Sequence, residues 1–68
     1  MTMTIDDIEQ RIAGIRAIAR DDEAAHRAED SLREDVLHAI AHGTCEDPQR
    51  AAKLAISTGE IDFCRWCA

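Results

Sequence analysis

The chain has 68 residues, a formal net charge of −6, and only one phenylalanine and one tryptophan. A chain this short forms one domain, residues 1–68, with a thin core, because folding removes from water only about 60% of the surface that the unfolded chain exposes. The acidic balance and the single lysine argue against the basic surface that binds phosphate backbones, so nucleic acid is not an expected partner.

The sequence shows no targeting or membrane-spanning segment. The N-terminal stretch MTMTIDDIEQ lacks a basic region followed by an apolar run, and no stretch reaches the ~20 apolar residues that cross a bilayer. We therefore expect a cytoplasmic protein without membrane contact. In a reducing compartment its three cysteines are expected to be free thiols or metal ligands rather than disulfides.

The first predicted element is an amphipathic helix over residues 5–19. Its apolar positions alternate three and four apart, which places them on one stripe: Ile5, Ile8, Ile12, Ile15 and Ala19. Thr4 is the expected N-cap, and Asp6 and Asp7 suit the positive end of the helix dipole. The same stripe becomes polar beyond residue 20, so either the helix ends there or its apolar face shifts.

A second helix is predicted from Asp21 or Asp22 to a stop at Gly43. Its apolar stripe is formed by Ala25, Ala28, Leu32, Val36 and Ala39 or Ile40. The pairs Glu23–Arg27 and Glu29–Arg33 have the spacing of surface ion pairs. A start at Ser31, with Glu34 completing a capping box, is the alternative.

A turn near residues 20–22 predicts that the two helices form an antiparallel hairpin, with the isoleucine end of the first helix near Ile40. Asp47 and Pro48 then predict the start of a short third helix that runs to a stop near Gly59 and fills the open end of the hairpin. The remaining tail, EIDFCRWCA, is expected to be extended and to place Ile61, Phe63 and Trp66 over the hairpin.

The cysteines suggest a zinc site. The segments HGTC and CRWC each place two ligands three positions apart, so that one tight turn could present both to a single ion. The alternative reading is therefore a zinc-stabilised mini-domain whose ligands are His42, Cys45, Cys64 and Cys67. If the cysteines bind no metal, each is instead expected to be a small buried apolar group.

Enzymatic activity is not expected. His38 and His42 share the spacing of metalloprotease helices, but the residues between them include no glutamate that could act as a base. No Ser/His/Asp set or phosphate-binding glycine loop is present, and a redox role for CRWC would need a thioredoxin-like sheet that the sequence does not predict.

Two resemblances concern the C-terminal part. The run RAAKLAISTGEIDFCRW resembles a helix-turn-helix motif, although its spacing departs from that pattern after Leu54; the resemblance implies a DNA-binding regulator as a second alternative. The ending EIDFCRWCA is similar to that of small proteins of actinobacteria and their phages, which have no assigned chemistry. That similarity implies an origin and leaves the mechanism open.

The sequence thus predicts an all-α fold, with an antiparallel helical hairpin, a short third helix and an extended aromatic tail. The predicted core comprises Ile8, Ile12, Ile15, Leu32, Val36, Ile40, Leu54, Phe63 and Trp66. The preferred function is a non-enzymatic protein-interaction module without a cofactor, such as a phage or mobile-element accessory protein that acts on a host protein. The partner would be another protein or a second copy of the chain.

Overall fold

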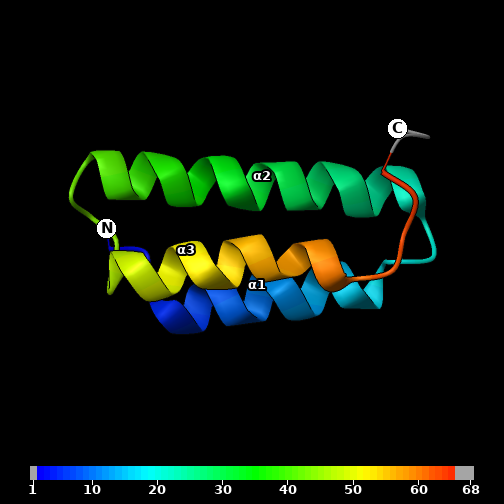
Figure 1. Cartoon of the computed structure of the whole chain (residues 1–68), viewed down its shortest axis with the longest axis horizontal. Helices are drawn as coiled ribbons and strands as arrows, with labels where there is room; N and C mark the ends of the chain where they lie inside the picture. The colour runs from blue at the N-terminus through cyan, green and yellow to red at the C-terminus, as the bar shows by residue number, and fades with distance from the viewer. Residues whose placement is uncertain (1, 66–68) are drawn as a thin grey trace.

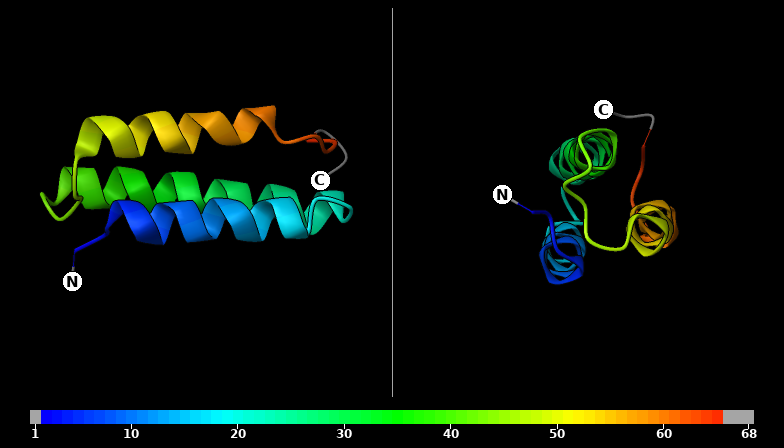
Figure 2. Two further views of the ribbon diagram at one scale, coloured as in Figure 1. Left: turned by 90° about the horizontal axis from the view of Figure 1, so that it is seen from below. Right: turned by 90° about the vertical axis from the view of Figure 1, so that its left-hand side faces the viewer.

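The computed structural model describes residues 2–65, which form three α-helices: α1 (Ile5–Ala17), α2 (Asp22–Ala41) and α3 (Pro48–Ser57). One turn of 3-10 helix, η1 (Thr58–Glu60), follows α3. Helices α1 and α3 run in the same direction and α2 runs against both (Figure 1). Seen end-on, the three helices occupy the corners of a triangle (Figure 2). The all-α class and the antiparallel hairpin are confirmed.

Each helix begins where a capping side chain was predicted. The Thr4 hydroxyl accepts a hydrogen bond from the Asp7 amide, and the Asp7 carboxylate accepts one from the Thr4 amide, which completes a capping box. The Asp21 carboxylate caps α2, and the Asp47 carboxylate accepts from the amide of Arg50 in α3. These local bonds satisfy amides that have no partner within their own helix.

The helix ends differ slightly from the prediction. Helix α1 stops at Ala17, two residues early, because Asp21 must leave the helical conformation to cap α2. Helix α2 is continuous through Ser31, so the alternative start at that residue is wrong. It ends at Ala41 with His42 as the C-cap residue, one position before the predicted cap, Gly43, whose φ of +71° is a left-handed conformation that glycine adopts without strain.

The core lies along the axis of the bundle. Six predicted core residues are buried, namely Ile8, Ile12, Ile15, Leu32, Val36 and Phe63. The core also includes residues that were not on the predicted list: Ile5, Ala25, Ala51, Ala55 and Ile61. Ile40 and Leu54 pack against this core but are only half-buried, and Trp66 lies outside the described residues.

Helix α3 does more than fill one end of the hairpin. It packs along both α1 and α2, and its small residues Ala51 and Ala55 face the core. Alanines allow the three backbones to approach closely, which is how a chain with two aromatic residues still encloses its isoleucines. The predicted third helix therefore does not only close one end of the hairpin: α3 forms the third side of the bundle along its length.

The segment before α1 is tied to the loop between α2 and α3. The Met3 amide donates to the Thr44 carbonyl at 2.8 Å, and the Glu46 amide donates to the Met3 carbonyl at 2.9 Å, forming an isolated parallel bridge between Met3 and Cys45. The Glu46 carboxylate also accepts from the Ile5 amide. Among residues 2–65, no helix is both long and apolar enough to cross a membrane.

Candidate functional site

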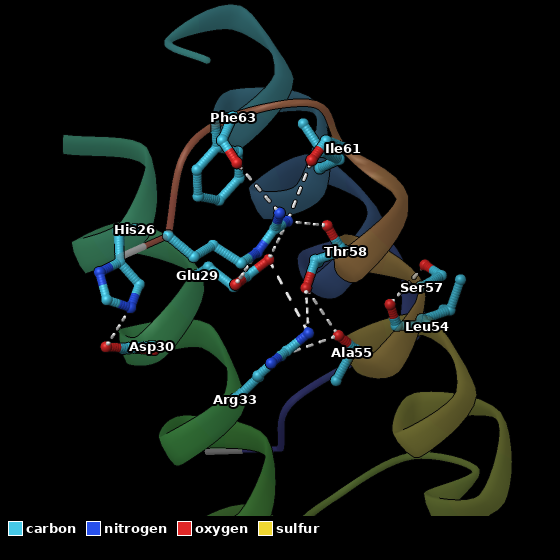
Figure 3. Close-up of polar contacts among 11 residues, drawn as sticks. His26, Glu29, Asp30, Arg33, Leu54, Ala55, Ser57, Thr58, Ile61 and Phe63 are labelled. Atoms are coloured by element: carbon cyan, nitrogen blue, oxygen red, sulfur yellow. Dashed lines mark hydrogen bonds and ion pairs between the residues drawn. The ribbon is translucent and has the colours of Figure 1, made fainter. Parts of the chain in front are cut away.

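Two features of the described chain have functional potential, a buried ion pair and an exposed apolar groove. The ion pair joins Glu29, in the middle of α2, to Arg65 in the C-terminal segment. Glu29 is only 1% exposed, and its two carboxylate oxygens each lie 3.0 Å from a guanidinium nitrogen of Arg65. Figure 3 shows Glu29 pointing from α2 toward the segment that carries Thr58 and Ile61.

The Arg65 guanidinium is also bound by backbone oxygens of its own segment. It donates to the carbonyls of Thr58 at 2.8 Å, Ile61 at 3.0 Å and Phe63 at 3.2 Å. Its central carbon lies 3.9 Å from the centroid of the Phe63 ring, within the range of a cation–π contact. Arg65 therefore folds its own segment into a compact turn and fastens it to α2.

Arg33, one turn after Glu29, joins the same network to α3. Its Nε donates to the Ala55 carbonyl at 3.3 Å and its Nη2 donates to the Thr58 hydroxyl at 3.1 Å. The Thr58 hydroxyl in turn donates to the Ala55 carbonyl, as drawn in Figure 3. Arg33 Nη2 lies 3.8 Å from Glu29 Oε2, so it adds positive charge beside the buried carboxylate. Arg33 also satisfies the Ala55 carbonyl near the end of α3.

The network sets the charge of its members. Burial by itself raises the pKa of the Glu29 carboxyl. The interactions with the Arg65 and Thr58 side chains and the positive charges of Arg33 and Arg65 together outweigh it, so the pKa of Glu29 lies below its ordinary value of 4.5. The hydrogen bond to Glu29 raises the pKa of Arg65, although burial opposes that shift. Both groups are charged at neutral pH, as a structural ion pair requires.

The apolar groove runs between α2 and α3. It has a volume of about 300 Å³ and is lined by Arg33, Val36, Leu37, Ile40, Ala52, Ala55 and Ile56. Leu37 is 67% exposed and Ile56 is 72% exposed, and they are two of the three large apolar side chains that are exposed in the described chain. Arg33 belongs to both features, so the ion network fixes the spacing of α2 and α3 at the groove.

Exposed charged residues of both signs flank the groove. Asp30 and Glu34 lie on α2 one turn before the lining residues Arg33 and Leu37, and both are exposed. On α3, the exposed Lys53 lies one turn before Ile56, and the lining residue Arg33 is itself a cation. A ligand in the groove would therefore meet apolar side chains flanked by both signs of charge, on a chain whose net charge is −6.

The three predicted zinc ligands that the structure describes, His42, Cys45 and Cys64, are not brought together. His42 and Cys45 lie after the end of α2, whereas the Cys64 amide donates to the Asp22 carboxylate at the start of that helix. A 20-residue helix is about 30 Å long, so this distance separates Cys64 from the other two. Cys67 lies outside the described residues. Within residues 2–65, no group of three or more His, Cys, Asp or Glu side chains is placed to hold a metal.

Both described cysteines are free thiols. Burial and the charges of Asp47 and Glu46 raise the pKa of the Cys45 thiol, which keeps it protonated and unreactive at neutral pH. Cys64 is half-buried beside the start of α2. Cys45 is thus a small group that packs against the core, as expected for a cysteine that binds no metal.

The segment that resembles a helix-turn-helix motif does not form a second helix where the motif requires one. Helix α3 and η1 end at Glu60, and residues 61–65 are irregular. Ile61 and Phe63 are buried against the bundle instead of presenting a face to solvent. The described part of this segment therefore serves the core and the Arg65 contacts.

Sequence reasoning missed the role of Glu29 because its spacing to Arg33 suggested a surface pair. The surface pair Glu23–Arg27 is confirmed at 2.9 Å, but Glu29 is directed inward. A signal was present: Ala25, Glu29, Leu32 and Val36 follow the 4-3-4 spacing of one helix face, so Glu29 lies on the core stripe. A carboxylate at such a position requires a cation within hydrogen-bonding distance, which the half-buried Arg65 provides.

Comparisons of the chain with models of protein families, with curated proteins and with solved structures gave no match.

Proposed function

We propose that this protein is a non-enzymatic interaction module whose α2–α3 groove binds the apolar face of an amphipathic helix from a basic protein. The observation that carries the proposal is the exposure of Leu37 and Ile56 at a groove whose lining is apolar apart from Arg33. In a domain with so few large apolar residues, leaving two of them in water forgoes about 1.5–3 kcal/mol of burial for each. A partner that covers both would recover that free energy.

A helix is the ligand that fits this groove best. The groove lies between two packed helices, and a further helix placed there would extend the bundle by the same ridge-into-groove packing. Peptides that bind in this manner present apolar anchors at positions i, i+3 or i+4, and i+7. The groove offers Val36, Leu37 and Ile40 on one wall and Ile56 on the other.

Charge favours a basic partner over a second copy of the chain. Two copies would each bring a net charge of −6 to the contact, and the exposed carboxylates Asp30 and Glu34 beside one groove would approach the same groups of the other copy. A helix with lysine or arginine beside its apolar stripe would instead place cations near these carboxylates. Such pairs at the rim would raise the association rate and set the orientation more than the affinity.

The biological setting is also part of the proposal. The similarity of the chain's ending to proteins of actinobacteria and their phages supports a phage or mobile-element accessory protein that acts on a host protein in the cytoplasm. The acidic surface supports a protein ligand rather than nucleic acid. The Glu29–Arg65 pair and the neighbouring Arg33 support the same role, because Arg33 joins α2 to α3 and so fixes the geometry of the groove before a partner binds.

The proposal can be tested with two synthetic helical peptides that share a leucine stripe and differ only in carrying lysine or glutamate on the polar face. NMR titration of the isotope-labelled protein should show that the lysine peptide shifts the signals of Leu37, Ile40 and Ile56. Ile56→Ser should weaken binding about tenfold or more, since it removes a buried apolar anchor. Ile18→Ser is the matched control, because Ile18 is exposed and does not line this groove.

Three outcomes would contradict the proposal. The glutamate peptide could bind as tightly as the lysine peptide, the shifts could fall outside the groove, or Ile18→Ser could weaken binding as much as Ile56→Ser. Sedimentation of the protein alone completes the test. A dimer whose formation is abolished by Ile56→Ser would show that the groove binds a second copy instead.

A further inference from the structure

His38 and His42 form a pair on the exposed surface of α2 that neither the core nor the groove uses. The two residues are one helical turn apart, and their rings are stacked with centroids 6.3 Å apart and planes inclined by 18°. Side chains at i and i+4 lie on the same face of a helix, so both imidazoles can reach one ion beside the helix. Both residues are exposed, which leaves room for water to complete a coordination shell.

The hydrogen bond of His42 orients it as a ligand. Its Nδ1 lies 2.8 Å from the His38 carbonyl oxygen. A carbonyl oxygen can only accept, so Nδ1 carries the proton and the neutral ring keeps its lone pair on Nε2. Metal-binding histidines have this arrangement in general, with the ring N–H of the non-coordinating nitrogen bound to a carbonyl or carboxylate.

The local field also favours a cation. His38 lies in the last turn of α2 and His42 is the C-cap residue, so both are at the negative end of the helix dipole. Glu34 lies one turn earlier, with its Oε1 3.5 Å from His38 Nε2. This carboxylate adds negative charge beside the pair. Coordination of an ion would need only the two imidazoles.

We propose that His38 and His42 chelate a transition-metal dication of the class that prefers imidazole, such as Ni²⁺, Cu²⁺ or Zn²⁺. The site is a two-point surface chelate with water as the remaining ligand. It differs from the four-ligand zinc site predicted from the sequence because it uses none of Cys45, Cys64 and Cys67. The inference does not depend on the proposed partner binding, since the two histidines do not line the groove.

The test is a titration of the full chain with Ni²⁺, followed by isothermal calorimetry and by the NMR signals of the three imidazole rings. One equivalent should bind, with the signals of His38 and His42 affected and that of His26 unchanged. His38→Gln and His42→Gln should each weaken binding about tenfold or more, because a chelate loses its effective concentration when either ligand is removed. His26→Gln is the matched control, and its affinity should equal that of the wild type.

The cysteines are tested separately with Cys45→Ser. If that variant weakens binding as much as a histidine variant, the ion is held by a thiol and the proposal is wrong. The proposal is also overturned if no Ni²⁺ binds in the micromolar range, or if both histidine variants bind as the wild type does. Circular dichroism of each variant verifies that the helix content is unchanged, so that lost binding cannot be assigned to unfolding.

Discussion

Replacing Glu29 by glutamine tests whether the buried ion pair stabilises the fold. Glutamine has the size of glutamate, so the packing is preserved while the charge and one acceptor oxygen are lost. Its amide group can still accept one hydrogen bond from Arg65, but its NH2 group then faces a second N–H donor. A hydrogen bond to a charged group contributes about 1.5–3 kcal/mol, so losing one and weakening the other predicts a cost of about 2–4 kcal/mol.

The lower half of that range is expected, because the Arg65 side chain is 32% exposed and water can partly replace the lost carboxylate. A 68-residue domain has a total stability of about 3–10 kcal/mol, so even the smaller value removes a large share of it. Urea unfolding followed by far-UV circular dichroism measures the change directly. Glu34→Gln is the matched control, because Glu34 is 74% exposed and its loss should change the stability by less than about 0.5 kcal/mol.

A Glu29→Gln variant as stable as Glu34→Gln would refute the reasoning. The double variant with Arg65→Gln separates the pair from other effects of Glu29. If the two side chains act as a unit, the double variant should be destabilised by less than the sum of the two single variants. Strict additivity would show that the ion pair does not form in solution.

Three further predictions follow from the caps, the glycines and the buried carboxyl. The pKa of Glu29 in the folded chain is below 4.5, so its stabilising contribution is complete above that pH and is lost as the pH falls toward the folded pKa. The acid unfolding curves of the wild type and Glu29→Gln should therefore converge at low pH. Gly14→Ala should stabilise the protein by about 0.5–1 kcal/mol, because an added Cβ has no neighbour within 4 Å. Gly43→Ala should destabilise it by about 1–2 kcal/mol, because φ is +71° there. Thermal melting measures both changes, and equal shifts in melting temperature would contradict both predictions. Thr4→Ala should cost about 1 kcal/mol in urea unfolding by removing the N-cap of α1, and Thr2→Ala, which removes no capping bond, should cost nothing measurable.

The helices were predictable because their signals are local. The isoleucine spacing fixed the face of α1, and the caps Thr4, Asp21 and Asp47 marked the helix starts within a few residues of each signal. Gly43 marked the end of α2 in the same way, since it alone could adopt the left-handed conformation at no cost. The end of α1 was predicted two residues late, because Ile18 and Ala19 continue the apolar character of the helix.

The candidate sites depend on contacts between distant residues, which spacing does not reveal. Glu29 and Arg65 are 36 positions apart and meet only because the chain after η1 returns to α2. The groove depends on the separation of α2 and α3, which is set by the contacts of Arg33 together with the alanines between the two helices. Conversely, the equal spacing within HGTC and CRWC suggested one metal site, but the length of α2 places Cys45 and Cys64 at opposite ends of the bundle.

The buried carboxylate has one more consequence, for the alignment of the helices with one another. Eight of the eleven buried apolar residues are isoleucine or alanine, so sliding one helix by a turn, about 5.4 Å, would mostly exchange one such side chain for another. Glu29, however, meets Arg65 at only one setting of α2 against the C-terminal segment, and any shifted arrangement would break both Arg65 hydrogen bonds and leave the buried carboxylate with only the longer 3.8 Å contact to Arg33 of its own helix. We therefore expect this single polar contact to select one alignment among several that apolar packing alone would tolerate.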